Sequence, residues 1–177
     1  MARYLAPIIV FAAMVTMFYF ALGKDPNELP SPYLGKAAPQ FELPRVRDPA
    51  RTIGSADYAG QTVLINIWAT WCVGCRQEHD FLLQLAREGS VPIIGINWRD
   101  NRSEAIRWLE SLGDPYVASG YDEDGRVGID WGAYGAPETF LIGPDGTVLY
   151  KHISPLNARV WQEEFLPRIQ AISQASL

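Results

Sequence analysis

Runs of apolar residues divide this chain into short strands and amphipathic helices. TVLINIWA (62–69) and VPIIGIN (91–97) are almost wholly apolar and rich in β-branched residues. Such runs are typical of strands buried on both faces of a parallel or mixed sheet. Apolar positions then follow helical spacing over residues 76–88, which end at a glycine. Apolar residues have helical spacing again in SEAIRWLESLG (103–113). This segment opens with Ser103, a good N-cap, and ends at Gly113.

The C-terminal part continues with two strands and a helix. GAPETFLI (135–142) leads into a third strand, and GPDG (143–146) is a strong turn signal. Residues 147–153 are therefore expected to pair back antiparallel, and a last amphipathic helix is expected over 157–173. The order β-α-β-α-β-β-α predicts an α/β sandwich with a mixed central sheet and flanking helices.

The N-terminal segment differs from the rest. Tyr4–Leu22 is a stretch of 19 residues without a charge, just long enough to cross a bilayer as a helix, and Arg3 precedes it. We therefore expect a transmembrane anchor at 1–23, a proline-containing linker at 24–37 and a globular domain at 38–177. The positive-inside rule places that domain outside the cytoplasm. A cleaved secretory signal, the alternative, would place it on the same side.

Composition narrows the class of protein. Apolar residues make up 48% and charged residues 20% of the chain, which is typical of a folded domain and excludes a disordered one. The net charge is −5, and no concentrated basic face indicates a nucleic-acid partner.

Cys72 and Cys75 are the only cysteines. Their spacing can therefore be compared with that of a zinc site, a structural disulfide and a redox pair. A structural zinc site needs four ligands, and the two histidines, His79 and His152, do not have the usual spacing. A purely structural disulfide would close a very small loop and gain little entropy.

A redox pair explains the same residues better. Cys72 follows a buried strand directly and would lie at a helix N-terminus, where unsatisfied N–H groups and the helix dipole lower a thiol pKa. Cys75, one turn later, is placed to resolve a mixed disulfide, and Trp68 and Trp71 flank the pair. A CxxC beside a βαβ pattern is a recognised redox signal.

Several segments resemble known proteins. WATWCVGC (68–75) resembles the active-site motif of the thioredoxin superfamily. GRVGIDWGAYGAPETFLIGPDG (125–146) closely resembles the matching stretch of the CcmG/DsbE family, membrane-anchored thiol:disulfide oxidoreductases of cytochrome c maturation. Further similar segments are NWRD (97–100), KHISPL (151–156) and APQFELP (38–44), so that the resemblance covers most of residues 36–170.

The resemblance implies a thioredoxin-like sandwich and a set of site residues. Pro137 matches the cis-proline that packs against the cysteine sulfurs and leaves the neighbouring backbone free to bind a substrate strand; an ordinary trans proline is the alternative. Asn66 stands where thioredoxins carry a buried aspartate, so acid–base chemistry must come from elsewhere. Glu78 and Glu138 match acidic positions of the family and are the candidates, with Asp100 a further acidic neighbour.

The groove beside the cysteines is expected to include Trp71, Val73, Gly74, Tyr134 and Ala136. Many family members have proline directly after the first cysteine, whereas this chain has Val73 and then Gly74, which would loosen the first helical turn. Solvated or core roles are the alternatives for Glu78, Glu138 and the aromatic residues.

By resemblance, the protein is a reductant on the periplasmic side of a bacterial inner membrane, with no cofactor beyond its disulfide. Its expected partners are apocytochrome c or a thiol carrier of haem ligation, and a membrane thiol reductant as electron donor. Two alternatives remain: a general periplasmic reductase or oxidant of the same fold, and a copper-carrying assembly protein that would use the two cysteines and His152.

Overall fold

The computed structural model describes residues 2–22 and 33–175. The chain divides into two compact units, residues 1–30 and residues 31–177. In the first unit, α1 (Ala2–Leu22) covers the uncharged stretch. No helix among the described residues combines the length and apolar character needed to cross a bilayer. The predicted transmembrane anchor is therefore not confirmed.

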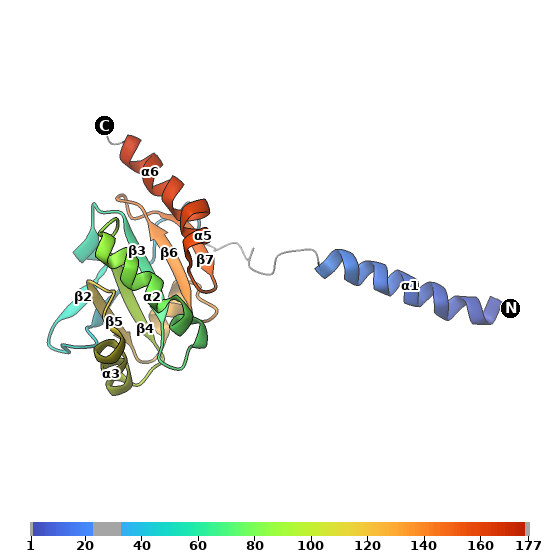
Figure 1. Ribbon diagram of the computed structural model, residues 1–177, viewed down its shortest axis with the longest axis horizontal. Helices are drawn as coiled ribbons and strands as arrows, with labels where there is room; N and C mark the ends of the chain where they lie inside the picture. The colour runs from blue at the N-terminus through green and yellow to red at the C-terminus, as the bar shows by residue number, and fades with distance from the viewer. Residues whose placement is uncertain (1, 23–32, 176–177) are drawn as a thin grey trace. The chain divides into compact units, whose positions relative to one another are not determined.

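The second unit is built on a mixed five-stranded sheet with the order β5-β4-β3-β6-β7 (Figure 1). β3 pairs parallel with β4, and β4 with β5, whereas β6 pairs antiparallel with both β3 and β7. The predicted α/β sandwich with a mixed sheet is confirmed. The strands are β3 (Val63–Trp68), β4 (Ile93–Trp98), β5 (Ala118–Asp122), β6 (Glu138–Ile142) and β7 (Val148–Ile153).

One face of the sheet is covered by helices. α2 lies across it in Figure 1, and apolar side chains of α2, α3 and the C-terminal helices pack there around Trp68 and Leu64. The C-terminal helix predicted as one element is interrupted by a π-helical turn. The elements of this layer are α2 (Val73–Glu88), α3 (Arg102–Leu112), α5 (Ala158–Val160), η2 (Trp161–Phe165) and α6 (Leu166–Ala175).

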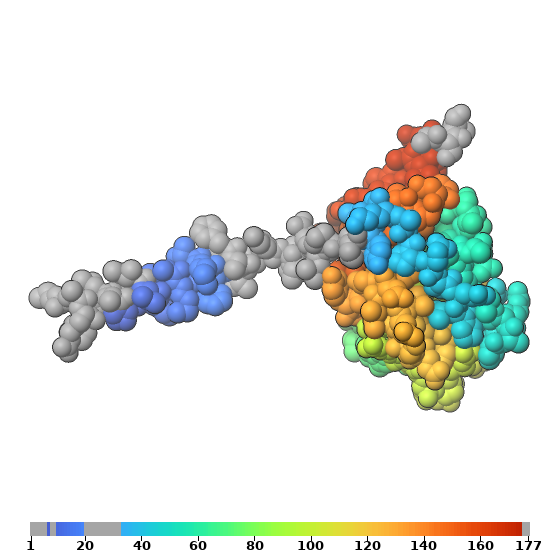
Figure 2. All heavy atoms as spheres, turned by 180° about the vertical axis from the view of Figure 1, so that it is seen from behind, coloured from blue at the N-terminus to red at the C-terminus, as the bar shows by residue number. Residues whose placement is uncertain are grey.

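The opposite face is covered by the N-terminal part of the domain and a short helix. Figure 2 shows this side, with the N-terminal part in blue to cyan beside residues near 120–140 in yellow to orange. Phe41, Tyr58 and Trp131 pack here against Phe140. This layer contains β1 (Glu42–Pro44), β2 (Thr52–Gly54), η1 (Ser55–Tyr58) and α4 (Arg126–Asp130).

Three boundaries differ from those predicted. The helix expected from residue 76 begins at Val73. The N-cap of α3 is Asn101 rather than Ser103, because the Asn101 side chain accepts the N–H groups of Ser103 and Glu104. Leu34, within the stretch expected to be linker, already forms a β-bridge with Val148.

β5 is a strand that the sequence pattern does not predict. Its residues ASGYD include glycine, serine and aspartate, so no apolar run marks it as a strand. The strand is stabilised by partners distant in sequence, since Ser119 Oγ accepts the indole N–H of Trp68 at 2.9 Å and Gly120 packs against Leu43.

Gly95 in β4 provides a test of this packing. A Cβ atom there would lie 2.6 Å from Ser119 Oγ and 2.8 Å from Trp68 Nε1. Gly95→Ala is expected to lower the free energy of unfolding in urea by about 2 kcal/mol, because the core would be overpacked and the indole hydrogen bond displaced. Gly135→Ala, where a Cβ meets nothing within 4 Å, is the control and should change it by less than about 0.5 kcal/mol. Equal effects of the two substitutions would contradict this account.

Candidate active site

The cysteine pair lies where β3 ends and α2 begins. Cys72 and Cys75 form a disulfide, with Cα atoms 5.3 Å apart, and both side chains are buried. Cys72 is the N-cap of α2, because its Sγ accepts the N–H of Cys75 at 3.0 Å. The sulfur therefore sits at the positive end of a 16-residue helix, an environment that favours a thiolate in the reduced state.

Two proline rings pack on the turn between the cysteines. A Cβ atom at Gly74 would lie 2.8 Å from Pro137 Cδ and 3.1 Å from Pro155 Cγ. The Ala136–Pro137 bond is cis, as predicted. Gly74 is thus needed for the close approach of these rings, and it lies within the first turn of α2, which begins at Val73.

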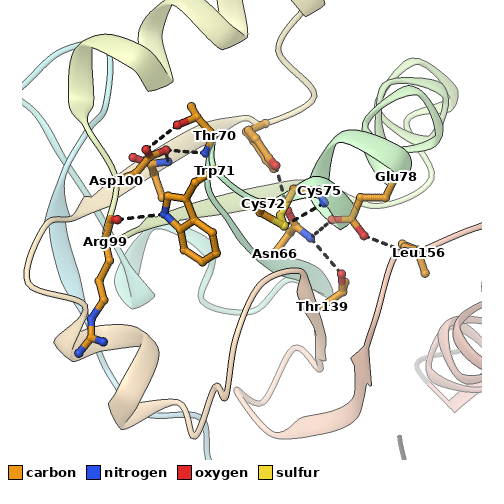
Figure 3. The surroundings of a disulfide bond; sticks show 12 residues. Asn66, Thr70, Trp71, Cys72, Cys75, Glu78, Arg99, Asp100, Thr139 and Leu156 are labelled. Carbon is orange, nitrogen blue, oxygen red and sulfur yellow. Dashed lines mark hydrogen bonds between the residues drawn. A yellow bond between two sulfur atoms is a disulfide. The ribbon is translucent and has the colours of Figure 1, made fainter.

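A buried hydrogen-bond network lies beside the disulfide (Figure 3). Asn66 on β3 donates through Nδ2 to Glu78 Oε1 at 2.8 Å and to Thr139 Oγ1 at 3.0 Å. Its Oδ1 accepts the hydroxyl of Tyr116 at 2.9 Å. The second carboxylate oxygen of Glu78 accepts the N–H of Leu156 at 2.7 Å. Asn66 Nδ2 thus makes two bonds and Oδ1 one, which fixes the orientation of the amide.

Burial controls the protonation of this network. It raises the pKa of Glu78 from its ordinary value near 4.5 to about 7, although the bonds from Leu156 and Asn66 partly oppose the shift. Burial and the nearby Glu78 charge raise the pKa of Tyr116 well above its ordinary value, so its hydroxyl stays a donor. Glu78 is only 1% exposed, which contradicts the alternative of a solvated helix carboxylate. A carboxyl group with this pKa can exchange protons at neutral pH.

Glu138 is not brought to the disulfide. It lies directly opposite Ile67 in the β3–β6 ladder, whereas the next residue, Thr139, lies opposite Asn66. Because side chains alternate along a strand, Glu138 points to the sheet face away from Asn66. Its carboxylate pairs with Lys151 instead, at 2.8 Å. Glu138, predicted together with Glu78 as an acid–base candidate, therefore lies on the sheet face away from Asn66 and is paired with Lys151.

Asp100 shapes the approach to the cysteines rather than adding a free charge. Its carboxylate accepts bonds from the backbone N–H and the hydroxyl of Thr70 and from the Asn97 amide. It therefore joins the loop after β4 to the residues just before the cysteine motif (Figure 3). The indole N–H of Trp71 donates to the Arg99 carbonyl at 3.1 Å, which fixes the ring beside that loop.

Three of the residues expected in the groove are exposed, two of them next to Cys72 in the chain and one in the loop before Pro137. Trp71, Val73 and Tyr134 are large apolar side chains that are 54%, 75% and 63% exposed. Ala136 is partly buried against the core next to the cysteines. Exposed apolar side chains beside a reactive cysteine, as Trp71 and Val73 are, are typical of a binding surface.

The two histidines are accounted for by packing. His79 Nε2 lies 3.1 Å from the Gly113 carbonyl oxygen, and its ring packs edge-on against Trp108. His152 Nε2 lies 2.9 Å from Ser154 Oγ. Burial lowers the pKa of both imidazoles. Within residues 2–22 and 33–175, no group of three His, Cys, Asp or Glu side chains is arranged to hold a metal ion.

Sequence reasoning did not identify Tyr116, Thr139 or Lys151 as part of the site. Thr139 could have been predicted from its position within PETF. It is the first residue of this strand whose side chain faces the disulfide layer. Tyr116 and Lys151 could not have been predicted from the sequence, because their partners are distant along the chain.

Comparison with known proteins is consistent with this site. A family model described as Redoxin matches residues 34–164. The chain is 46% identical over 165 residues to the thiol:disulfide interchange protein DsbE of Allochromatium vinosum, covering 93% of this chain and 91% of the relative. It is 44% identical over 170 residues to DsbE of Escherichia coli K12, covering 92% and 91%. The crystal structure of a secreted thiol-disulfide isomerase from Corynebacterium glutamicum shares the fold, with a TM-score of 0.67 and 23% identity over 75% of this chain and 85% of that one.

The pKa of Glu78 predicts a pH-dependent stability for the oxidised protein. The carboxyl titrates near 4.5 when unfolded and at about 7 when folded, so the folded state binds its proton more tightly. Protonation of Glu78 therefore stabilises the folded state fully below about pH 4.5, and this stabilisation is lost as the pH rises through about 7. At ~1.4 kcal/mol per pKa unit, the loss is up to ~3 kcal/mol.

Urea unfolding across this pH range measures the effect. Glu78→Gln cannot titrate, so its free energy of unfolding should fall less than that of the wild type. Glu88→Gln removes an exposed carboxylate of the same helix and should follow the wild-type curve. Parallel curves for the wild type and Glu78→Gln would show that folding does not raise the pKa of Glu78.

Proposed function

Because the chain belongs to the redoxin family and, within it, to the DsbE thiol:disulfide interchange proteins, we propose that it is a reductant of cytochrome c maturation. As a member of that family it is a thiol:disulfide oxidoreductase, and Cys72–Cys75 is its redox-active disulfide. The proposed substrate is the disulfide of an apocytochrome c CxxCH haem site, or of a thiol carrier that serves it. Haem attachment requires both thiols of that site in reduced form.

Reduction begins from the Cys72 thiolate. It attacks one sulfur of the substrate disulfide, a mixed disulfide forms, and the other substrate sulfur leaves as a thiolate that takes up a proton. The capping position supports this role, because the backbone N–H of Cys75 points at the Cys72 sulfur. The exposed side chains of Trp71, Val73 and Tyr134 support contact with an extended, unfolded segment.

Cys75 completes the reaction. Its thiol loses a proton and attacks Cys72 Sγ, which forms the Cys72–Cys75 disulfide and releases the second substrate thiol. The two electrons gained by the substrate come from the two cysteines, and a membrane thiol reductant restores them. Glu78 is the group beside the disulfide with a pKa near neutrality and is proposed to accept the Cys75 proton.

The observation that carries this proposal is the identity to DsbE proteins over nine-tenths of the chain. A general extracytoplasmic thiol reductase, or an oxidant, would use the same cysteines in the same fold and remains the second candidate. A copper carrier would need a third ligand, and the histidine considered for it, His152, lies against Ser154.

We also propose that the N-terminal segment holds the protein at the bacterial inner membrane with the domain in the periplasm. The uncharged stretch Tyr4–Leu22 and the preceding Arg3 support this. The full chain should then stay with membranes during alkaline carbonate extraction. Protease should digest its domain once the outer membrane is opened. Recovery of the full chain in the soluble fraction would contradict the proposal.

The direction of electron flow is tested by the equilibrium reduction potential of Cys72–Cys75 in the full chain. A value in the range of about −270 to −180 mV is expected for a reductant of apocytochrome thiols. A value near about −120 mV would identify an oxidant and rule out the maturation role.

The order of attack is tested with Cys75→Ser. This variant should accumulate a mixed disulfide between Cys72 and a peptide that contains an oxidised CxxCH site, because the resolving thiol is missing. Mass spectrometry detects the adduct. Cys72→Ser should form none, and an adduct on Cys75 in that variant at a similar rate would reverse the assigned roles.

A further inference from the structure

The loop that leads into β6 carries two residues of the expected substrate groove, Tyr134 and Ala136. Its backbone is tied to the side chain of Glu138. Oε1 of Glu138 accepts the N–H of Tyr134 at 2.7 Å and the N–H of Gly135 at 3.2 Å. The carboxylate therefore determines the path of the chain immediately before the cis bond at Pro137.

Lys151 on β7 holds that carboxylate in place. Its Nζ lies 2.8 Å from Glu138 Oε2 and donates to the Gly132 carbonyl at 2.8 Å. The same ammonium lies 4.7 Å from the centre of the Tyr134 ring, within the range of a cation–π contact. One buried ammonium thus contacts the start of the loop, its exposed aromatic ring and the carboxylate that binds its backbone.

The ion pair is built as a rigid support. The side chains of Lys151 and Glu138 are 3% and 1% exposed, and the ammonium also lies 5.2 Å from the Phe140 ring centre. Charges buried this deeply persist only when they are paired and hydrogen-bonded. Lys151 lies opposite Phe140 in the β6–β7 ladder, so it shares the sheet face of Glu138, away from the Asn66 layer.

We propose that Lys151 is a positioning residue: through its ion pair with Glu138 it holds the loop 132–137, with Tyr134, in the shape that receives a peptide disulfide. Glu138 then serves the reaction by binding backbone rather than by exchanging protons with the cysteines. The inference rests on the proposed function, since it assigns this loop to the recognition of an extended substrate.

The test compares two disulfide substrates of the reduced full-length protein. One is a peptide with an oxidised CxxCH site, and the other is a small aromatic disulfide that needs no groove. Lys151→Met removes the ammonium and should slow the reaction with the peptide about tenfold, because the loop loses its position. The reaction with the small disulfide should change by less than about twofold, since Cys72 and its helix are untouched.

Two matched variants control for other effects. Lys151→Arg keeps a cation at the site and should react with the peptide nearly as fast as the wild type. Lys36→Met removes one positive charge at an exposed position and should leave both rates unchanged. Should Lys151→Met fail to fold because Glu138 is left unpaired, the double variant Lys151→Met, Glu138→Gln carries the same test with both charges removed.

The outcomes separate the two proposals. A folded Lys151→Met or double variant with the wild-type peptide rate would overturn the positioning role, as would equal loss with both substrates. A shift in the pH profile of Cys72 alkylation in Glu138→Gln would assign Glu138 to proton exchange and overturn it as well. Failure of the wild type to reduce the peptide, while it reduces the small disulfide, would overturn the proposed function instead.

Discussion

The hydrogen bond from Asn66 to Glu78 is the interaction on which the site depends. A carboxyl group buried to this degree needs partners for both oxygens, and it obtains them from β3 and from the backbone at Leu156. Meeting that requirement brings together β3, β6, α2 and the residues that follow β7, beside the disulfide (Figure 3). The cysteines acquire their proton-exchanging neighbour as a consequence of the same packing.

The sheet separates two carboxylates that the family resemblance groups together. Glu78 approaches the disulfide layer from α2, whereas Glu138 points from β6 into the layer formed by β1, β2, η1 and α4. Glu78 is hydrogen-bonded by neutral groups and has a pKa near neutrality, whereas Glu138 is paired with the Lys151 ammonium at 2.8 Å. Two buried acids close in sequence to the reactive elements thus have different surroundings: neutral hydrogen-bond donors at Glu78, and an ammonium with two loop N–H groups at Glu138.

Much of the fold could be predicted because it depends on local patterns. The apolar runs at β3 and β4, the turn at 143–146 and the helical spacing after Cys75 each identify an element from neighbouring residues alone. β5 could not be predicted, because its glycine and serine form a strand only when Trp68 and Leu43 pack against them. Apolar spacing marks α2 only from residue 76, and its first turn could be predicted only from the cysteine motif, whose Cys72 is the N-cap.

The sequence by itself determined that a CxxC pair follows a buried strand, that a proline precedes another strand and that an acidic residue lies one turn past Cys75. These features depend only on the spacing of neighbouring residues along a helix or strand, so the sequence alone is enough to determine them. Only the tertiary structure decided which acid faces the disulfide and why Gly74 must be a glycine. It also decided that Tyr116 and Lys151 belong to the site. Burial, hydrogen-bond partners and the resulting pKa values arise between residues distant in the chain, and these exist only once the layers have packed.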